Sequence, residues 1–279
     1  MKLKLSIFFI LASVFCFGVF ACSAKTSSAV NEPEKQNTSP VAEPTPEKAT
    51  KLPVAQNVTV ISADKLPLAG TLFESSNPKS SAVLLLHQFG SDRHAYDAFA
   101  KRLQIKGFNV LSIDGRGFGE SVKTADGKTI GPSRTDESVK AMNGDVAAAF
   151  EFLAIQKNVD PTRVGIIGAS YGSSLAIFYA AENTKVAAVA LLSPGLNYFG
   201  NMPTEPAIKK YGDRPLYLLA ATDDNESVRA VEKLNPIVGG KAKYDQTIHP
   251  SGGHGTALLK VGAIEELEVF FSKRLGLVK

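Results

Sequence analysis

The chain has 279 residues, of which 44% are hydrophobic and 21% charged, and its formal net charge is +4. This composition is typical of a folded protein and excludes a wholly disordered chain. The small positive charge leaves no electrostatic footprint for nucleic acid. The 2 Cys both lie near the start, which excludes a disulfide scaffold and a cysteine zinc cluster.

The first residues have the pattern of an export signal. Lys2 and Lys4 precede an apolar run that ends in small residues. The end of this run, residues 19–22 (Val-Phe-Ala-Cys), resembles a bacterial lipobox. The resemblance implies that residues 1–21 are a signal peptide and that lipid on Cys22 anchors the mature protein to a membrane of the bacterial cell envelope. Ordinary secretion or an uncleaved transmembrane helix are the alternatives, because the run is nearly long enough to span a bilayer.

Residues 22–55 are rich in proline and contain no aromatic side chain. Such a segment cannot bury enough apolar surface to fold, and its prolines keep it extended. The sequence therefore predicts a disordered Pro-rich tether over residues 22–55 and a single folded domain over residues 56–279.

From residue 56 onward, apolar runs alternate with helical patterns. The predicted strands cover residues 57–62, 69–74, 82–86, 108–113, 164–168, 187–192, 215–220 and 243–248. The predicted helices cover residues 95–106, 138–156, 171–181, 226–234 and 257–274. The first two strands form a hairpin, whereas the later solid apolar runs indicate strands buried on both faces. Such alternation predicts an α/β fold with helices on both faces of a parallel sheet and working residues at the carboxyl ends of strands.

The strongest chemical signal is Gly-Ala-Ser-Tyr-Gly at residues 168–172. It lies between a predicted strand and a predicted helix, the setting in which a sharp turn exposes a serine hydroxyl as a nucleophile. The start of the following helix also directs backbone N–H groups toward negative charge. We therefore predict Ser170 as the nucleophile, with a helix N-cap serine as the alternative.

A serine nucleophile requires a base, and in the order serine, acid, histidine only His249 and His254 come late enough. His254 lies in a glycine-rich loop before the last helix, which can carry an imidazole to the sheet edge. His249 ends a strand and precedes Pro250, which favours a structural role. We therefore predict His254 as the base.

The acid that orients the histidine is expected after the strand at residues 215–220. Asp223 and Asp224 both follow that strand. The spacing favours Asp224, and Asp223 remains the alternative. The other carboxylate of the pair is expected to help start the helix at Glu226.

The oxyanion of a tetrahedral intermediate requires N–H donors. The backbone N–H of Tyr171, directly after the nucleophile, is one candidate. The loop after the strand at residues 82–86 supplies the second, the N–H of Phe89. His87 in the same loop is expected to shape the turn through hydrogen bonds rather than to act as a base.

Together these residues resemble the α/β-hydrolase superfamily from about residue 56 to the end. Four blocks carry the resemblance: His-Gln-Phe-Gly at 87–90, Asp-Gly-Arg-Gly-Phe-Gly-Glu-Ser at 114–121, the serine turn at 168–172, and Asp224 with residues 253–255. Gln88 stands where the family's common pattern has glycine, and the second block is structural in the family, with Arg116 bracing the loop. The resemblance implies an eight-stranded, mostly parallel sheet and a serine hydrolase that uses no metal or cofactor.

Two short segments, residues 192–214 and 122–136, are the candidates for a small lid and a rim. We expect an open site lined by aromatic side chains: Phe89, Tyr171, Tyr198 and Phe199. Such a site suits a small-molecule ester with a small or medium acyl group. A peptidase, thioesterase or acyltransferase with the same residues is an alternative, as is a non-catalytic binding lipoprotein.

Overall fold

The structure is a computed structural model that describes residues 52–238, 240 and 243–276. The predicted signal peptide at 1–21, the lipidation site Cys22 and nearly all of the predicted tether lie outside the described residues. Near the start of the described residues, the carbonyl of Pro53 accepts a hydrogen bond from Nε2 of Gln104 at 2.9 Å. None of the helices in the described ranges is both long enough and apolar enough to cross a membrane.

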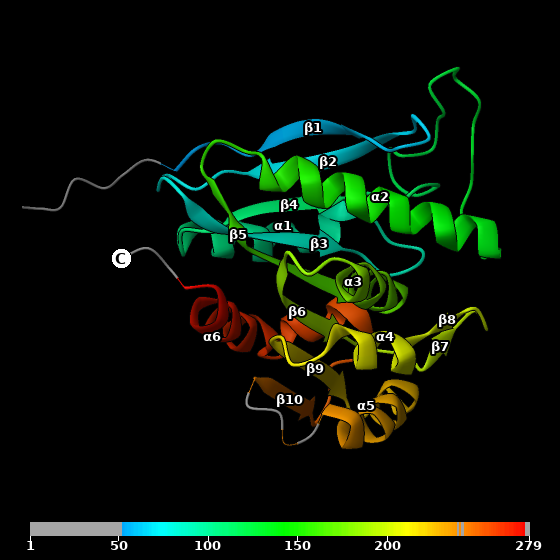
Figure 1. The fold of residues 1–279 in the computed structure, drawn as a ribbon, viewed down its shortest axis with the longest axis vertical. Coiled ribbons are helices and arrows are strands. Elements are labelled where there is room, and N and C mark those ends of the chain that lie inside the picture. The colour runs from blue at the N-terminus through cyan, green and yellow to red at the C-terminus, as the bar shows by residue number, and fades with distance from the viewer. Residues whose placement is uncertain (1–51, 239, 241–242, 277–279) are drawn as a thin grey trace, which may run out of the picture. The chain divides into compact units, whose positions relative to one another are not determined.

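Eight strands form one sheet in the order β1-β2-β4-β3-β5-β6-β9-β10, which runs from top to bottom in Figure 1. The strands are β1 (Gln56–Ile61), β2 (Pro67–Phe73), β3 (Ser80–Leu86), β4 (Asn109–Ile113), β5 (Val159–Ala169), β6 (Val186–Leu192), β9 (Leu216–Ala221) and β10 (Tyr244–His249). Strand β2 is antiparallel to both of its neighbours, and all other pairs are parallel. The predicted eight-stranded, mostly parallel sheet is confirmed.

The central strands are buried on both faces because each face carries its own hydrophobic core. Along β3, Leu84 and Leu86 belong to one core, whereas Val83 and Leu85 belong to the other. This alternation is the period of two expected of a strand. It also explains why these strands read as solid apolar runs in the sequence.

Helices cover both faces, as predicted. The first core includes residues of α2 (Asp136–Ala154), α3 (Tyr171–Glu182) and α5 (Asn225–Val238). The second core includes residues of α1 (Asp97–Ile105) and α6 (Ala263–Leu275). The last helix was predicted from residue 257, but residues Gly255–Lys260 form a 3-10 turn (η2) instead. The break falls at Gly262, whose φ of +106° no right-handed helix can contain.

The lid candidate at residues 192–214 is a small packed insertion. It contains a two-stranded hairpin, β7 (Asn197–Tyr198) and β8 (Met202–Pro203), followed by α4 (Thr204–Tyr211). The sequence did not predict α4, which is only two turns long and carries Pro206 in its first turn, where proline is tolerated. Ile208 and Tyr211 of α4 are buried, so this segment is anchored to the domain.

Candidate active site

Ser170 occupies a sharp turn between β5 and α3. Its φ of 55° and ψ of −125° are strained for a non-glycine residue, and such strain is concentrated at functional sites. Glycines on both sides make the turn possible. A Cβ on Gly168 would lie 2.0 Å from the carbonyl oxygen of Gly172, and one on Gly172 would lie 2.6 Å from that of His87. The sequence motif therefore has the predicted strand–turn–helix setting.

The structure brings Ser170, His254 and Asp224 into one hydrogen-bonded chain. Nε2 of His254 lies 2.7 Å from Oγ of Ser170, and Nδ1 lies 2.7 Å from Oδ2 of Asp224. The carboxylate can only accept, so the hydrogen-bond pattern assigns the imidazole proton to Nδ1 and leaves Nε2 to accept the serine proton. The His254 side chain is 44% exposed, whereas that of Asp224 is 9% exposed. A buried acid thus supports an imidazole that remains open to solvent.

The two adjacent carboxylates have different partners. Asp224 binds His254, and its Oδ1 also faces the backbone N–H of Ser227 in α5 at 3.4 Å. Asp223 accepts hydrogen bonds from the N–H groups of Gly252 and Gly253 at 3.2 and 3.0 Å. The expectation that the second carboxylate starts the helix is therefore wrong, because Asp223 instead fixes the loop that carries His254.

Both carboxylates are held in their charged form. Burial raises the pKa of Asp224, but its contacts with Ser227 and His254 outweigh that effect and leave the pKa below its usual range. Hydrogen bonds from Gly253 and Gly252 lower the pKa of Asp223. A charged Asp224 is what an imidazolium at His254 needs beside it.

The loop after β3 contains the proposed oxyanion donor Phe89 and is tied to the histidine loop. Oε1 of Gln88 accepts hydrogen bonds from the backbone N–H and from Oγ1 of Thr256, at 2.7 and 2.8 Å. Gly255 permits this contact, because a Cβ there would lie 2.4 Å from Oε1 of Gln88. On the other side, Tyr171 is the first residue of α3, where backbone N–H groups have no partner within the helix.

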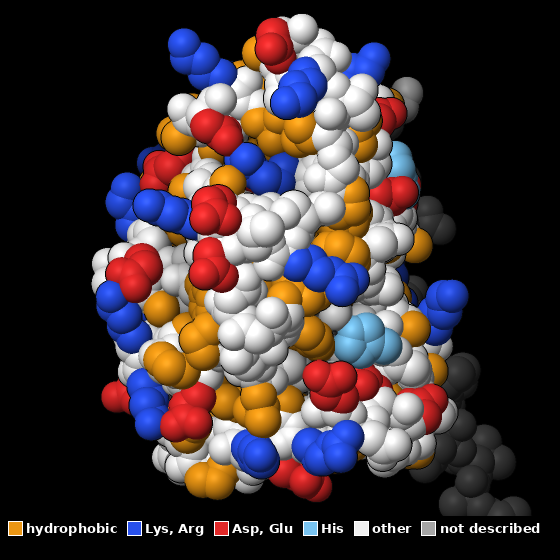
Figure 2. Space-filling model, turned by 90° about the vertical axis from the view of Figure 1, so that its right-hand side faces the viewer, with side chains coloured by type: hydrophobic (Ala, Val, Ile, Leu, Met, Phe, Trp, Pro, Cys, Tyr) orange, Lys and Arg blue, Asp and Glu red, His pale blue; other side chains and the backbone are white. Residues whose placement is uncertain are grey.

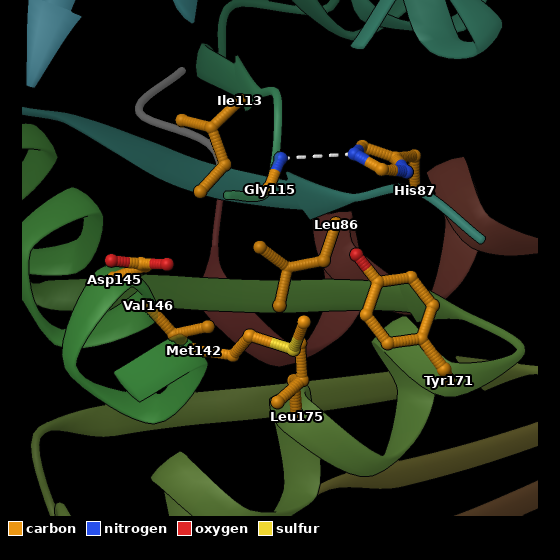
Figure 3. A pocket seen from close by; sticks show the side chains of 9 residues that line it. All are labelled: Leu86, His87, Ile113, Gly115, Met142, Asp145, Val146, Tyr171 and Leu175. Carbon is orange, nitrogen blue, oxygen red and sulfur yellow. Dashed lines mark hydrogen bonds between the residues drawn. The ribbon is translucent and has the colours of Figure 1, made fainter. Parts of the chain in front are cut away.

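His87 is a structural side chain, as predicted. It is 2% exposed, its Nε2 accepts from the N–H of Gly115 at 2.9 Å, and its Nδ1 lies 2.8 Å from the carbonyl of Gln88. Burial lowers the pKa of His87, which keeps the ring neutral. His87 and Tyr171 line a cavity of about 10 Å³. Figure 3 shows them together with Met142 and Leu175, which line the same cavity. The Tyr171 ring is thus buried, and its backbone is the part adjacent to the nucleophile.

The other late histidine also has a structural contact. Nε2 of His249, at the end of β10, lies 3.2 Å from Oε2 of Glu266 on α6. Tyr217 donates a hydrogen bond to the same carboxylate at 2.9 Å. Nε2 of His249 is buried and makes no hydrogen bond among the described residues, so His249 lies against α6, while His254 contacts Ser170.

The block at residues 114–121 forms a brace beside the site. Asp114 is fully buried and binds both the backbone N–H and the guanidinium of Arg93, which is 2% exposed. Arg116 makes two-pronged contacts with Asp145 on α2 and with Asp64 before β2. The expected bracing role of Arg116 is confirmed, whereas the partnership of Arg93 with Asp114 had no signal in the sequence.

A cluster of aromatic rings lies against Tyr171, the residue after Ser170. Phe89 packs edge-on against Phe118 and Phe199, with ring centroids 4.9 and 5.2 Å apart. The Tyr198 hydroxyl donates to the carbonyl of Ser193 at 2.8 Å, and burial raises the pKa of Tyr198 to about 12. Tyr198 therefore stays protonated at neutral pH and cannot act as a base. In the described ranges, no three His, Cys, Asp or Glu side chains are grouped as a metal site would require.

The fold and this site together define an α/β-hydrolase enzyme. A family model described as "Serine aminopeptidase, S33" (Hydrolase_4) matches residues 77–225, more than half of the chain, and the protein belongs to that family. The matched residues include the loop after β3, the brace, the serine turn and Asp224.

Relatives share part of this sequence. An uncharacterised protein of Mycobacterium tuberculosis is 32% identical over 156 residues, which cover 56% of this chain and 51% of that protein. The quorum-quenching protein AidA of Acinetobacter baumannii is 29% identical over 171 residues, or 61% of this chain and 50% of that protein. The chain thus spans about half the length of these curated relatives.

Solved structures share the fold at low identity. An esterase of Pyrococcus furiosus has a TM-score of 0.61 at 18% identity, covering 80% of this chain and 92% of that chain. A dienelactone hydrolase of Anabaena variabilis has a TM-score of 0.61 at 19% identity, covering 82% and 100%. At these identities the likeness concerns the fold alone.

Proposed function

We propose that this protein is a serine hydrolase that cleaves a carboxylic ester through an acyl-enzyme on Ser170. The observation that carries the proposal is the hydrogen-bonded chain from Ser170 through His254 to Asp224, in which both contacts are 2.7 Å long. Ser170, the first residue of this chain, lies on a strained turn. A serine next to an oriented imidazole is the arrangement in which a weak hydroxyl becomes a nucleophile.

In the proposed acylation step, Oγ of Ser170 attacks the ester carbonyl while its proton passes to Nε2 of His254. Asp224 stabilises the resulting imidazolium through Nδ1–H. The N–H groups of Tyr171 and Phe89 hold the oxyanion of the tetrahedral intermediate. His254 then gives its proton to the departing alcohol, which leaves the acyl group on the serine.

Deacylation uses the same groups in the reverse roles. Water gives a proton to Nε2 of His254 as it attacks the acyl-enzyme, and the free acid leaves when Ser170 regains its proton. The half-exposed side chain of His254 supports this step, since solvent water has direct access to the base. The short insertion of β7, β8 and α4, with its aromatic residues Tyr198 and Phe199, favours small or medium acyl groups over long buried chains.

An amide substrate is the second candidate, because the family's description is that of an aminopeptidase. The same serine, imidazole and carboxylate can cleave an amide if the amine is protonated as it leaves. Lactone cleavage, suggested by the dienelactone hydrolase, would follow the ester mechanism with the alcohol retained in the product.

The test uses the full-length protein and its Ser170→Ala variant. A fluorophosphonate probe is expected to label the wild type and to leave Ser170→Ala unlabelled. Nitrophenyl esters of rising chain length and aminoacyl nitroanilides are then compared by kcat/KM, and we expect the short esters to be cleaved best. A folded wild-type protein that neither reacts with the probe nor cleaves any member of the panel would defeat the proposed function.

We also propose that lipid on Cys22 anchors the protein in the bacterial cell envelope and that residues 22–55 tether the hydrolase domain to the membrane. The sequence pattern before Cys22 supports this proposal. Metabolic labelling with a fatty acid and membrane fractionation test it. Cys22→Ser should lose the label and the membrane association, whereas Cys16→Ser should retain both, and equal labelling of the two variants would contradict the assignment.

A further inference from the structure

Arg134 lies between two aromatic rings at the edge of the candidate active site. The centre of its guanidinium lies 4.3 Å from the ring centroid of Phe89 and 4.8 Å from that of Phe199. Phe89 belongs to the loop after β3, and Phe199 belongs to the turn between β7 and β8. A guanidinium that stacks on aromatic faces keeps its N–H edge available for an anion.

The backbone at Arg134 is fixed although its side chain is exposed. Nδ2 of Asn201 donates to the carbonyl of Arg134 at 3.0 Å and to Oδ1 of Asp136 at 2.8 Å. Oγ1 of Thr135 accepts from the N–H of Ser138 and caps α2. The predicted rim segment, residues 122–136, is thus joined to the predicted lid segment, residues 192–214, and Arg134 lies at their junction.

The guanidinium of Arg134 has no protein carboxylate to neutralise it. Across the part of the chain that the structure describes, no carboxylate oxygen lies within 4.0 Å of it. By contrast, five other arginines form ion pairs: Arg93, Arg102, Arg116, Arg163 and Arg274. Arg134 therefore differs from these five arginines, whose guanidinium groups pair with carboxylates of the fold.

The aromatic rings that stack on Arg134 also pack against the residue that follows Ser170 in the chain. The ring centroid of Phe89 lies 5.7 Å from that of Tyr171, the residue after Ser170, and Phe199 lies 6.3 Å from both Tyr171 and Tyr198. Figure 2 views the side on which β7, β8 and the loop before α2 lie in Figure 1. Hydrophobic side chains reach the surface there, with basic, acidic and histidine side chains around them.

We propose that Arg134 binds an anionic group of the substrate, so that the enzyme prefers esters carrying a free carboxylate a few bonds from the scissile ester. This inference rests on the proposed function and adds a substrate class to it. The carboxylate would bind the N–H edge of the guanidinium as a two-pronged pair while the carbon chain lies against Phe89 and Phe199. The chemistry is unchanged: water cleaves the ester to an acid and an alcohol.

The kinetic test compares the monomethyl and dimethyl esters of succinic, glutaric and adipic acid, followed by methanol release. For the wild type, kcat/KM of the anionic monoester should exceed that of the neutral diester of the best-fitting length. In Arg134→Gln this ratio should fall by about tenfold, and Arg134→Lys should recover part of it, because the charge remains but the planar fork is lost. Lys157→Gln removes one positive charge just before β5, at the amino ends of the strands and away from Ser170, and should leave the ratio unchanged.

A binding test makes the result independent of turnover. Adipate is titrated calorimetrically into Ser170→Ala and into Ser170→Ala/Arg134→Gln. We expect weaker binding in the double variant by about the same factor. Equal ester ratios in the wild type and Arg134→Gln, together with equal adipate binding in the two Ser170→Ala proteins, would overturn the proposal. Arg134-dependent binding without ester cleavage would instead support the subsite and defeat the proposed ester chemistry.

Discussion

Two charged networks lie at the carboxyl ends of the sheet's strands. They differ in whether their last hydrogen bond goes to a group fixed in the fold or to a group that can be exchanged. In the Asp114 network (Arg93, Asp114 and Glu120), the buried Arg93 pairs with the buried Asp114 and with the exposed Glu120. Asp114 also accepts from the N–H groups of Arg93 and Glu120 at 2.7 and 2.8 Å. Every partner is fixed within the fold.

The serine network (Asp224, His254 and Ser170) begins in the same way, with a buried carboxylate after a strand. It ends differently, because the His254 ring is half-exposed and its last bond goes to a hydroxyl on a strained turn. That bond can be exchanged for one to a substrate or to water without breaking the fold. A closed network, in which every hydrogen bond is made within the fold, stabilises the structure. A network whose last hydrogen bond can be exchanged for one to substrate or water can move a proton.

The largest effect is expected from breaking the serine network at its acid. Asp224→Asn should lower kcat by roughly 10⁴-fold, because the amide no longer fixes the Nδ1–H tautomer or stabilises the imidazolium. Asp223→Asn removes the same charge from the neighbouring residue, which contacts only the backbone of Gly252 and Gly253. It should cost less than about tenfold. Steady-state kinetics with one ester measures kcat for both variants. Equal decreases in kcat would contradict the assignment of Asp224 as the acid.

Breaking the closed network should change stability rather than chemistry. Asp114→Asn leaves the guanidinium of Arg93, which is 2% exposed, with only the exposed Glu120 as an anionic partner. Removing one partner of a buried pair costs about 3–5 kcal/mol in the free energy of unfolding. Urea denaturation measures this loss, and kcat at low denaturant should stay within a few-fold of the wild type.

The control for Asp114 is Asp97→Asn, which breaks the exposed pair with His94. An exposed ion pair contributes at most about 1 kcal/mol. If both variants lost the same free energy of unfolding, the buried Arg93–Asp114 pair would contribute no more to stability than an exposed pair.

The sequence could predict those parts of the site that depend on local pattern. The turn at Ser170 was identified because the glycines that permit it are two residues away on either side. The sheet was identified because strands buried on both faces give continuous apolar runs. Asp224 and His254 are predicted from their places after a strand and in a glycine-rich loop, and the structure places His254 between Ser170 and Asp224.

Contacts between distant segments could not be predicted where no motif marks the residues that meet. Gln88 and Thr256 are separated by 168 positions, and their hydrogen bonds depend on two loops meeting at one edge of the sheet. Arg134 has no local motif, and only the folded rim places it between Phe89 and Phe199. The role of Asp223 was missed for the same reason, since its partners lie in the loop after β10.

The contact between Gln88 and Thr256 provides a test with a smaller expected effect, because it links the loop after β3 to the loop that carries His254. Gln88→Ala should lower kcat by about tenfold, since Thr256 loses the acceptor for both its N–H and its hydroxyl. Gln88→Glu retains an acceptor and should recover most of the activity, with KM little changed in either variant. Equal impairment of the two variants would mean that side-chain size, and not the hydrogen bond, is what matters at this position.

The smallest effect is a pH dependence of stability from the buried His87. Burial lowers the folded-state pKa of His87 below its ordinary value of 6.5, so the unfolded chain binds the proton more readily. Stability should therefore fall as the pH decreases from about 6.5 toward the lowered pKa, by at most about 1.4 kcal/mol per pH unit. Urea denaturation at pH 7.5, 6.5 and 5.5 measures the slope.

The slope should become shallower in His87→Gln and should persist in His94→Gln, whose histidine is exposed. An unchanged slope in His87→Gln would mean that another group causes it.

The partner of each histidine Nε2 separates the two kinds of network. Nε2 of His87 already accepts the N–H of Gly115, so a second proton there would break a bond of the fold. Nε2 of His254 instead faces the hydroxyl of Ser170, which can donate to it. The two imidazoles thus differ in what each Nε2 faces: a fixed backbone N–H at His87 and an exchangeable hydroxyl at His254.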